Sequence, residues 1–151
     1  MPDELAELLD TALYKEIAAQ AFYIAGQKKT EDAGAKALMQ ELAGEEAKHA
    51  ELLKSFRDKG AKKGAFRRER VPDLRLSDYL TDGTSLEGAG LQDTLIFAIK
   101  REQQSIEFYL GLMGLLRDRN AKQMCERLVQ EELRHKLRLE MLYDDLFYGE
   151  D

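Results

Sequence analysis

The chain has 151 residues, 44% of them hydrophobic and 34% charged, with a formal net charge of −6 at pH 7. This length suits one domain over 1–151 with a buried core, and the acidic balance argues against nucleic-acid binding. No apolar run is as long as a membrane span, no signal-peptide pattern follows Met1, and the single Cys125 excludes disulfide and Cys-x-x-Cys frameworks, so we expect a cytoplasmic protein without a membrane partner.

Apolar residues that recur every three to four positions predict four helices. Two prolines in the whole chain leave these stretches free to be helical. The predicted helices cover about 3–29, 31–59, 91–117 and 120–147.

Polar residues and a glycine mark the expected helix ends. Thr30 is the expected N-cap of the second helix, with Glu31 and Asp32 in its first turn, where carboxylates oppose the positive helix end. Gly60 is the expected residue after the end of that helix, and Asn120 is the expected cap of the last one.

The segment 60–90 breaks the helical pattern with five glycines and a Val-Pro-Asp turn signal. If the second and third helices run the same way, the chain must return about 40 Å, the length of a helix of about 27 residues. We therefore expect a long crossover here. Its basic residues indicate a solvated loop, and docking of an acidic partner or anion is the alternative reading.

The only two histidines occur in a repeated motif, Glu46-x-x-His49 and Glu132-x-x-His135. Residues three apart lie on the same helix face, so each pair can hold one metal ion. A lone glutamate, Glu16 or Glu102, precedes each motif by 30 positions.

All these residues repeat at one constant offset of 86 positions, and Phe22-Tyr23 and Phe108-Tyr109 follow the same offset. Two copies of one helical hairpin explain the register. We therefore predict an all-α, ferritin-like antiparallel four-helix bundle in which a long crossover joins two hairpins and the ligands meet at one level. Glu45 and Glu131 stand beside the motif glutamates, about 100° around the helix, and are expected to face solvent.

Four carboxylates and two neutral imidazoles suit iron or manganese and balance the charge of two divalent cations. Without metal, four buried carboxylates would repel one another and be poorly solvated, which itself indicates a cation.

The sequence resembles the rubrerythrin branch of the ferritin-like superfamily in these two Glu-x-x-His motifs and in the lone glutamates that precede Phe-Tyr pairs. The resemblance implies two iron ions, with manganese as an alternative, and reduction of hydrogen peroxide or dioxygen. It implies that Glu46 and Glu132 bridge the metals, and that Tyr23 and Tyr109 lie beside the ligands as candidate catalytic residues. The alternative is that both are core tyrosines with satisfied hydroxyls. The implied metal ligands are Glu16, Glu46, His49, Glu102, Glu132 and His135.

Two departures from the family pattern and one comparison with bacterioferritins carry further expectations. Ser105 occupies the position of a seventh carboxylate found in rubrerythrins proper, which puts the histidine–glutamate exchange of that family in doubt. The chain has no four-cysteine rubredoxin domain, so a separate protein is the expected electron donor. Ala47 stands where bacterioferritins carry a haem-ligating methionine, so we expect no haem.

Competing functions are ferroxidase action that feeds a mineral core, and a bundle that only sequesters metal or acts as a scaffold. The absence of a short fifth helix disfavours a ferritin shell. We expect a homodimer, domain-swapped or not, because the long crossover permits exchange of hairpins. Cys125, the repeat partner of Met39, is expected to be a small core residue.

Overall fold

A computed structural model describes residues 4–59 and 90–148, which form four helices and confirm the predicted all-α bundle. The predicted crossover, including Gly60, lies outside the described residues apart from Gly90 at its end. None of the described helices combines the length and apolar content that crossing a membrane requires. The helices are α1 (Glu4–Lys29), α2 (Ala33–Asp58), α4 (Leu91–Leu115) and α5 (Arg119–Phe147).

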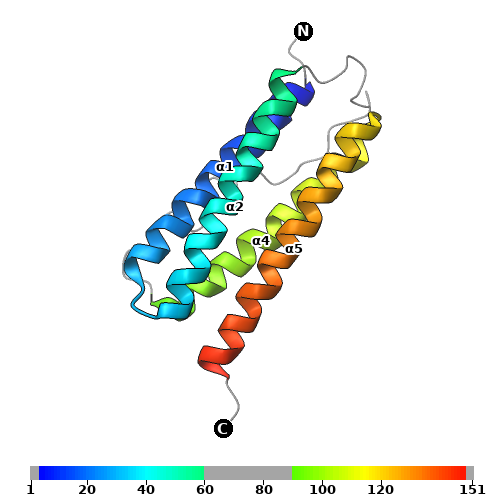
Figure 1. Cartoon of the computed structure of the whole chain (residues 1–151). Coiled ribbons are helices and arrows are strands. Elements are labelled where there is room, and N and C mark those ends of the chain that lie inside the picture. The colour runs from blue at the N-terminus through cyan, green and yellow to red at the C-terminus, as the bar shows by residue number, and fades with distance from the viewer. Residues whose placement is uncertain (1–3, 60–89, 149–151) are drawn as a thin grey trace.

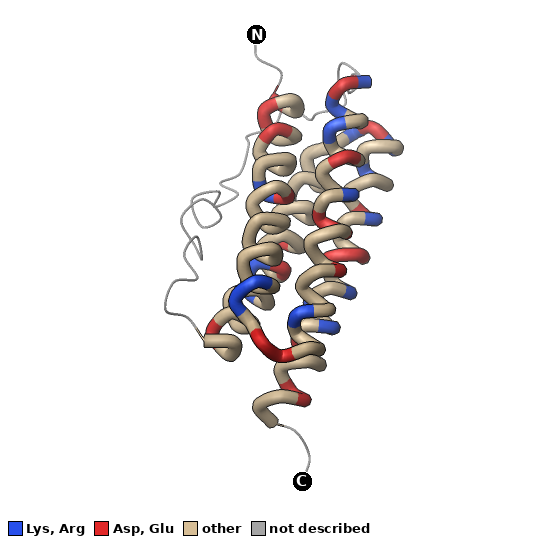
Figure 2. The backbone as a smooth tube through the Cα atoms, turned by 60° about the vertical axis from the view of Figure 1, so that its left-hand side comes forward, with Lys and Arg blue, Asp and Glu red and all other residues tan. Residues whose placement is uncertain are grey.

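The four helices lie side by side as two antiparallel hairpins, α1–α2 and α4–α5 (Figure 1). Helices α2 and α4 run in the same direction, as the length of segment 60–90 predicts (Figure 1). Across the hairpins α2 lies beside α5, and α1 lies beside α4. Charged positions of both signs occur along the helices (Figure 2). In each helix the buried residues recur at three-to-four spacing and most charged residues lie outside the buried set, so each helix presents one face to the bundle interior and a charged face to solvent.

The turn between α1 and α2 differs from the prediction at Thr30. The N–H of Thr30 still donates to the Gly26 carbonyl at 3.1 Å, so Thr30 completes the end of α1. Asp32 is the N-cap of α2, because its Oδ2 accepts a hydrogen bond from the Ala35 N–H at 2.8 Å. Glu31 and Asp32 thus precede the helix, and the prediction that they form its first turn is wrong.

The turn between α4 and α5 also begins earlier than predicted. Asp118, and not Asn120, is the N-cap of α5, and its Oδ2 accepts from the Ala121 N–H at 2.9 Å. To reach this position the chain leaves α4 after Leu115, and Leu116 is extended with φ −88° and ψ 148°. In both turns the aspartate whose oxygen reaches the third helical N–H begins the helix.

The hydrophobic core consists of two clusters at opposite ends of the bundle. One contains Leu9, Leu53 and Leu128, and the other contains Met39 and Leu139. On each of the four helices the predicted ligands fall, in sequence, between the parts of that helix that enter the two clusters. The polar level in the middle of the bundle is therefore closed off by apolar packing on both sides.

One pair of repeat positions in the core has its small and its large residue exchanged between the two hairpins. An added Cβ at Gly26 of α1 would lie 2.6 Å from the Met39 Sδ of α2. The repeat positions in the second hairpin are Leu112 and Cys125, both fully buried. Burial raises the pKa of the Cys125 thiol to about 12, as expected of a small core residue. The larger side chain of the pair thus comes from α2 in one hairpin and from α4 in the other.

This size exchange predicts energetic coupling between positions 26 and 39. Gly26→Leu alone should lower the free energy of unfolding by about 1–3 kcal/mol, because the added side chain overpacks against Met39. In combination with Met39→Cys, the cost should be smaller than the sum of the single changes by at least about 1 kcal/mol. Urea unfolding of the four proteins measures the coupling, and strictly additive effects would contradict this account of the packing.

Candidate metal centre

The structure brings all six predicted ligands together at the middle of the bundle. Each helix supplies its members from the inward face, because positions three and four apart share that face. All six side chains are buried, none with more than 2% of its surface exposed. They are Glu16 from α1, Glu46 and His49 from α2, Glu102 from α4, and Glu132 and His135 from α5.

The six side chains form two overlapping groups of four. The first comprises Glu16, Glu46, His49 and Glu132, whose candidate ligand atoms all lie within 4.8 Å of one another. The second group has the same compactness and is made of Glu46, Glu102, Glu132 and His135. Glu46 and Glu132 belong to both groups, which is the arrangement that two bridging carboxylates require.

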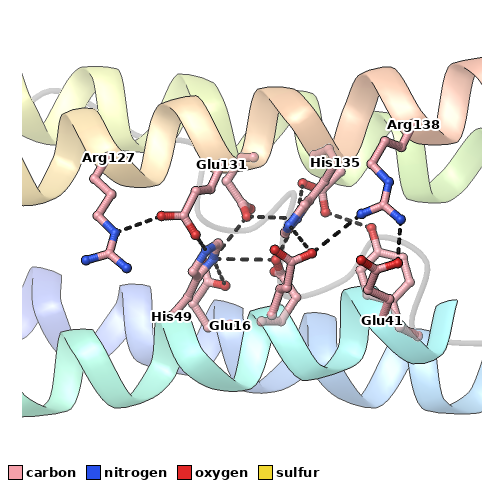
Figure 3. A network of polar contacts seen from close by, with 12 residues as sticks. Glu16, Glu41, His49, Arg127, Glu131, His135 and Arg138 are labelled. Carbon is pink, nitrogen blue, oxygen red and sulfur yellow. Dashed lines mark hydrogen bonds and ion pairs between the residues drawn. The ribbon is translucent and has the colours of Figure 1, made fainter. Parts of the chain in front are cut away.

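Both imidazoles turn the Nδ1 atom toward the carboxylates (Figure 3). The His49 Nδ1 lies 3.1 Å from Glu132 Oε1 and 3.4 Å from Glu16 Oε2. The His135 Nδ1 lies 3.0 Å from Glu46 Oε1 and 3.5 Å from Glu102 Oε2. The two rings stack with centroids 5.6 Å apart and planes inclined by 12°. Each Nδ1 atom thus lies nearest the motif glutamate of the opposite hairpin.

The two predicted tyrosines bind the lone glutamates across the hairpins. The Tyr23 hydroxyl donates to Glu102 Oε1 at 2.7 Å, and the Tyr109 hydroxyl donates to Glu16 Oε1 at 2.6 Å. Burial, together with the neighbouring carboxylates, raises the pKa of both hydroxyls well above the usual value, so they remain protonated donors. Both tyrosines therefore lie beside the ligands and are at the same time core residues with satisfied hydroxyls.

Without metal, two of the carboxylates, Glu46 and Glu102, have raised pKa values, whereas contacts with both histidines outweigh burial and lower the pKa of Glu132. Burial, and then the charge of Glu132, raise the pKa of Glu102 to about 7 and that of Glu46 well above its usual range. Burial alone would lower the histidine pKa values, but the close approach of the surrounding carboxylates outweighs it and raises them to about 11 for His49 and about 10 for His135. Metal binding at this cluster would displace protons from these groups.

Buried polar atoms that lack hydrogen bonds test whether these six residues fit a metal ion. Among the described residues, each of the six side chains keeps at least one buried nitrogen or oxygen atom without a hydrogen bond. The atoms include both oxygens of Glu46 and of Glu132, and the Nδ1 atoms of both histidines. Buried polar atoms without partners are costly, and a cation bound by hard oxygen and imidazole donors would satisfy them. The cluster therefore fits a metal site.

Glu45 and Glu131 do not simply face solvent, so that prediction is wrong. Each reaches the outer nitrogen of the histidine in the opposite hairpin (Figure 3). The Glu131 Oε1 lies 3.0 Å from His49 Nε2, and the Glu45 Oε2 lies 3.4 Å from His135 Nε2. The 100° between adjacent helical positions leaves both glutamates at the seam between α2 and α5, and not on the outer face.

Two buried cations, Lys15 and Arg101, also belong to this level and have no place in the predicted site. Lys15 Nζ lies 4.1 Å from the centre of the Phe108 ring, and the Arg101 guanidinium lies 5.4 Å from that of Phe22. Burial lowers the pKa of Lys15 to about 8, although the charges of Glu16 and three other ligands act in the opposite direction. The signal in the sequence is a basic residue directly before each lone glutamate, at the same offset of 86.

Comparisons with known proteins show the family and the fold of the chain. The profile of the Rubrerythrin family matches residues 7–143, which confirms the resemblance. The chain is similar to the structure of a hypothetical protein from Pyrococcus furiosus, with 26% identity over 97% of this chain and 92% of that chain, and a TM-score of 0.73. No curated protein sequence matches.

Two further solved structures share the fold. A candidate ferritin-like diiron-carboxylate protein from Thermotoga maritima is 22% identical over 93% of this chain and 94% of its own, with a TM-score of 0.70. A two-domain protein from Anabaena variabilis, with DJ-1/ThiJ/PfpI-like and ferritin-like domains, is 22% identical with a TM-score of 0.72. The match covers 91% of this chain and 38% of that one. These likenesses confirm the predicted ferritin-like bundle.

The two shared carboxylates predict a variant that separates metal binding from folding. The wild-type chain should bind about two divalent ions, and Glu46→Gln/Glu132→Gln should lose this binding. Without metal, the variant should still unfold in one cooperative urea transition, because the apolar clusters on both sides of the site are unchanged. Elemental analysis after anaerobic ferrous loading, with urea unfolding as the control, measures both. Metal content equal in the two proteins would contradict the ligand assignment.

Proposed function

Because the chain belongs to the rubrerythrin family, we propose that it is a non-haem di-iron oxidoreductase that reduces hydrogen peroxide or dioxygen. The observation that carries the proposal is the pair of overlapping four-residue groups that share Glu46 and Glu132. Two ferrous ions held there would supply the two electrons that, with two protons, convert one hydrogen peroxide to two waters.

The protein's own part is to hold the donor atoms in place in a dry interior. Each lone glutamate gives one oxygen to a tyrosine hydroxyl, so its orientation is fixed while the other oxygen faces the nearby histidine. The apolar clusters on both sides keep bulk water from the centre. The protonated hydroxyls of Tyr23 and Tyr109 donate hydrogen bonds of 2.7 and 2.6 Å to ligand oxygens and so hold these carboxylates in a fixed orientation.

The choice of iron belongs to the proposal, and manganese accepts the same oxygen and nitrogen donors. Haem is not part of it, since Ala47 of α2 offers no axial ligand beside Glu46. An external electron-donor protein is part of it, because reduction of peroxide oxidises the metal pair and the chain has no cysteine cluster to supply electrons.

One observation favours iron oxidation as a second candidate function. Position 105 of α4, one turn after Glu102, is a buried serine with 7% of its surface exposed. A serine offers no carboxylate there to change the coordination between oxidation states. Ferroxidase activity needs dioxygen and releases or stores ferric iron. It does not require a carboxylate at position 105.

A homodimer is proposed on the basis of the outer face of α5. Leu133, Leu137 and Met141 follow one another at four-residue spacing, and their exposed fractions are 38, 50 and 66%. Burial of this row against a second copy would remove apolar surface from water. Light scattering at micromolar concentration should give twice the chain mass of 17.2 kDa. A single-chain mass across that range would contradict the dimer.

The reaction itself is tested by the oxidant that the iron-loaded protein prefers. Stopped-flow mixing of the anaerobic diferrous protein should show faster oxidation by hydrogen peroxide than by dioxygen, because two ions can deliver two electrons to peroxide together. Ser105→Glu, which restores the missing carboxylate, should raise the ratio of the two rates. Faster oxidation by dioxygen with iron retained as a mineral would favour the iron-handling function. If the protein binds iron but turns over neither oxidant, metal sequestration is the remaining function.

A further inference from the structure

The two histidines are held differently on the side that faces away from the other ligands. The His49 Nε2 and the Glu131 Oε1 form a hydrogen bond of 3.0 Å. The corresponding His135 Nε2 lies 3.4 Å from Glu45 Oε2, and among the described residues it makes no hydrogen bond. The repeat therefore places a carboxylate behind each histidine but completes only one of the two contacts.

The charge one turn before each carboxylate explains the difference. Arg127 precedes Glu131 by four residues, and its Nε donates to Glu131 Oε2 at 2.8 Å. This leaves Glu131 Oε1 free to accept from His49. Burial raises the pKa of Glu131, but its hydrogen bonds with Arg127 and His49 outweigh burial and lower it, so the carboxylate is charged.

The repeat position of Arg127 in the first hairpin is Glu41, which carries the opposite charge. Glu41 cannot hold Glu45, and it engages Arg138 of α5 at 2.5 Å. Arg138 is 3.7 Å from Glu45, on the same oxygen that faces His135 (Figure 3). Glu45 is also the more exposed of the two carboxylates, 33% against 17% for Glu131.

A histidine that binds a metal through Nδ1 must carry its remaining proton on Nε2. A carboxylate that accepts from Nε2–H fixes this tautomer and the ring orientation, and it makes Nδ1 a better donor. Loss of such a partner typically costs about 10–100-fold in metal affinity. His49 has this support in the metal-free protein and His135 does not.

We propose that the two halves of the metal centre are unequal: the half that contains His49 binds its ion first and more tightly, because Glu131 and Arg127 position His49, and the half that contains His135 binds the second ion weakly. This inference rests on the proposed two-metal site and adds which half dominates and which residues decide it. Glu131 and Arg127 are positioning residues that act through His49.

Titration of the metal-free, full-length protein with Co²⁺, followed by its visible absorption and by calorimetry, tests the proposal. Repulsion between the two ions would by itself separate the binding steps, so the variants decide. Glu131→Ala should weaken the tight step at least about tenfold. Glu45→Ala, the matched change in the other hairpin, should leave the tight step within about threefold, because His135 has no such hydrogen bond to lose.

Two further variants distinguish positioning from general damage to the fold. Arg127→Gln should weaken the tight step by a smaller factor than Glu131→Ala, since Arg127 is 66% exposed, and Arg127→Lys should restore it. Glu41→Arg gives the first hairpin the residue found in the second, and it should strengthen the weak step several-fold by holding Glu45 against His135.

Single-histidine variants assign the halves. His135→Ala should keep a tight Co²⁺ step, and His49→Ala should lose it. The inference is overturned if the wild type binds two ions and Glu45→Ala costs as much as Glu131→Ala, or if His49→Ala keeps the tight step; the two-metal site would then still stand. A wild-type protein that binds no Co²⁺ would overturn both the inference and the two-metal site.

Discussion

Four carboxylates and two imidazoles are buried together at the middle of the bundle. The surrounding structure has to hold these charged groups away from solvent. Apolar side chains at this level would give a more stable bundle, and such side chains do fill the core on both sides of it. Instead the protein closes the level with apolar clusters, adds two buried cations and ties the lone glutamates to tyrosines. The cations and the tyrosine hydroxyls reduce the cost of burying the carboxylate charge before any metal is bound.

The shortest contacts at this level join the two hairpins. Tyr23 of the first hairpin binds Glu102 of the second, and Tyr109 returns the contact to Glu16. His49 reaches Glu132, and each histidine has the other hairpin's outer glutamate behind it. One hairpin alone therefore provides neither a complete donor set nor the hydrogen bonds that orient it. The site exists only at the seam, which makes hairpin association and site formation a single event.

The fold and the cluster could be predicted from the sequence because both follow from periodicity. Helical spacing places Glu46 and His49 on one face, and the constant offset of 86 brings the second set to the same level. The helix starts could not be predicted as well, since Thr30 and Asp32 are both good caps and only the path of the turn selects Asp32. Glu131 falls outside the predicted site because periodicity gives an angle around one helix and does not say how near α2 lies. Lys15 also falls outside it, since lysine in a core is rare without a compensating cluster.

The opposite placement of small and large buried residues in the two hairpins has a consequence for which hairpins pair with each other. Gly26 and Met39 form one pair, and Leu112 and Cys125 occupy the equivalent positions. Had the halves stayed identical, a hairpin could pair equally well with a copy of itself as with its counterpart, since both carry the same ligands. The unequal cores make the halves distinguishable where their chemistry is not. Packing thereby favours the pairing of unlike hairpins, which the metal ligands alone would not distinguish from the pairing of like hairpins.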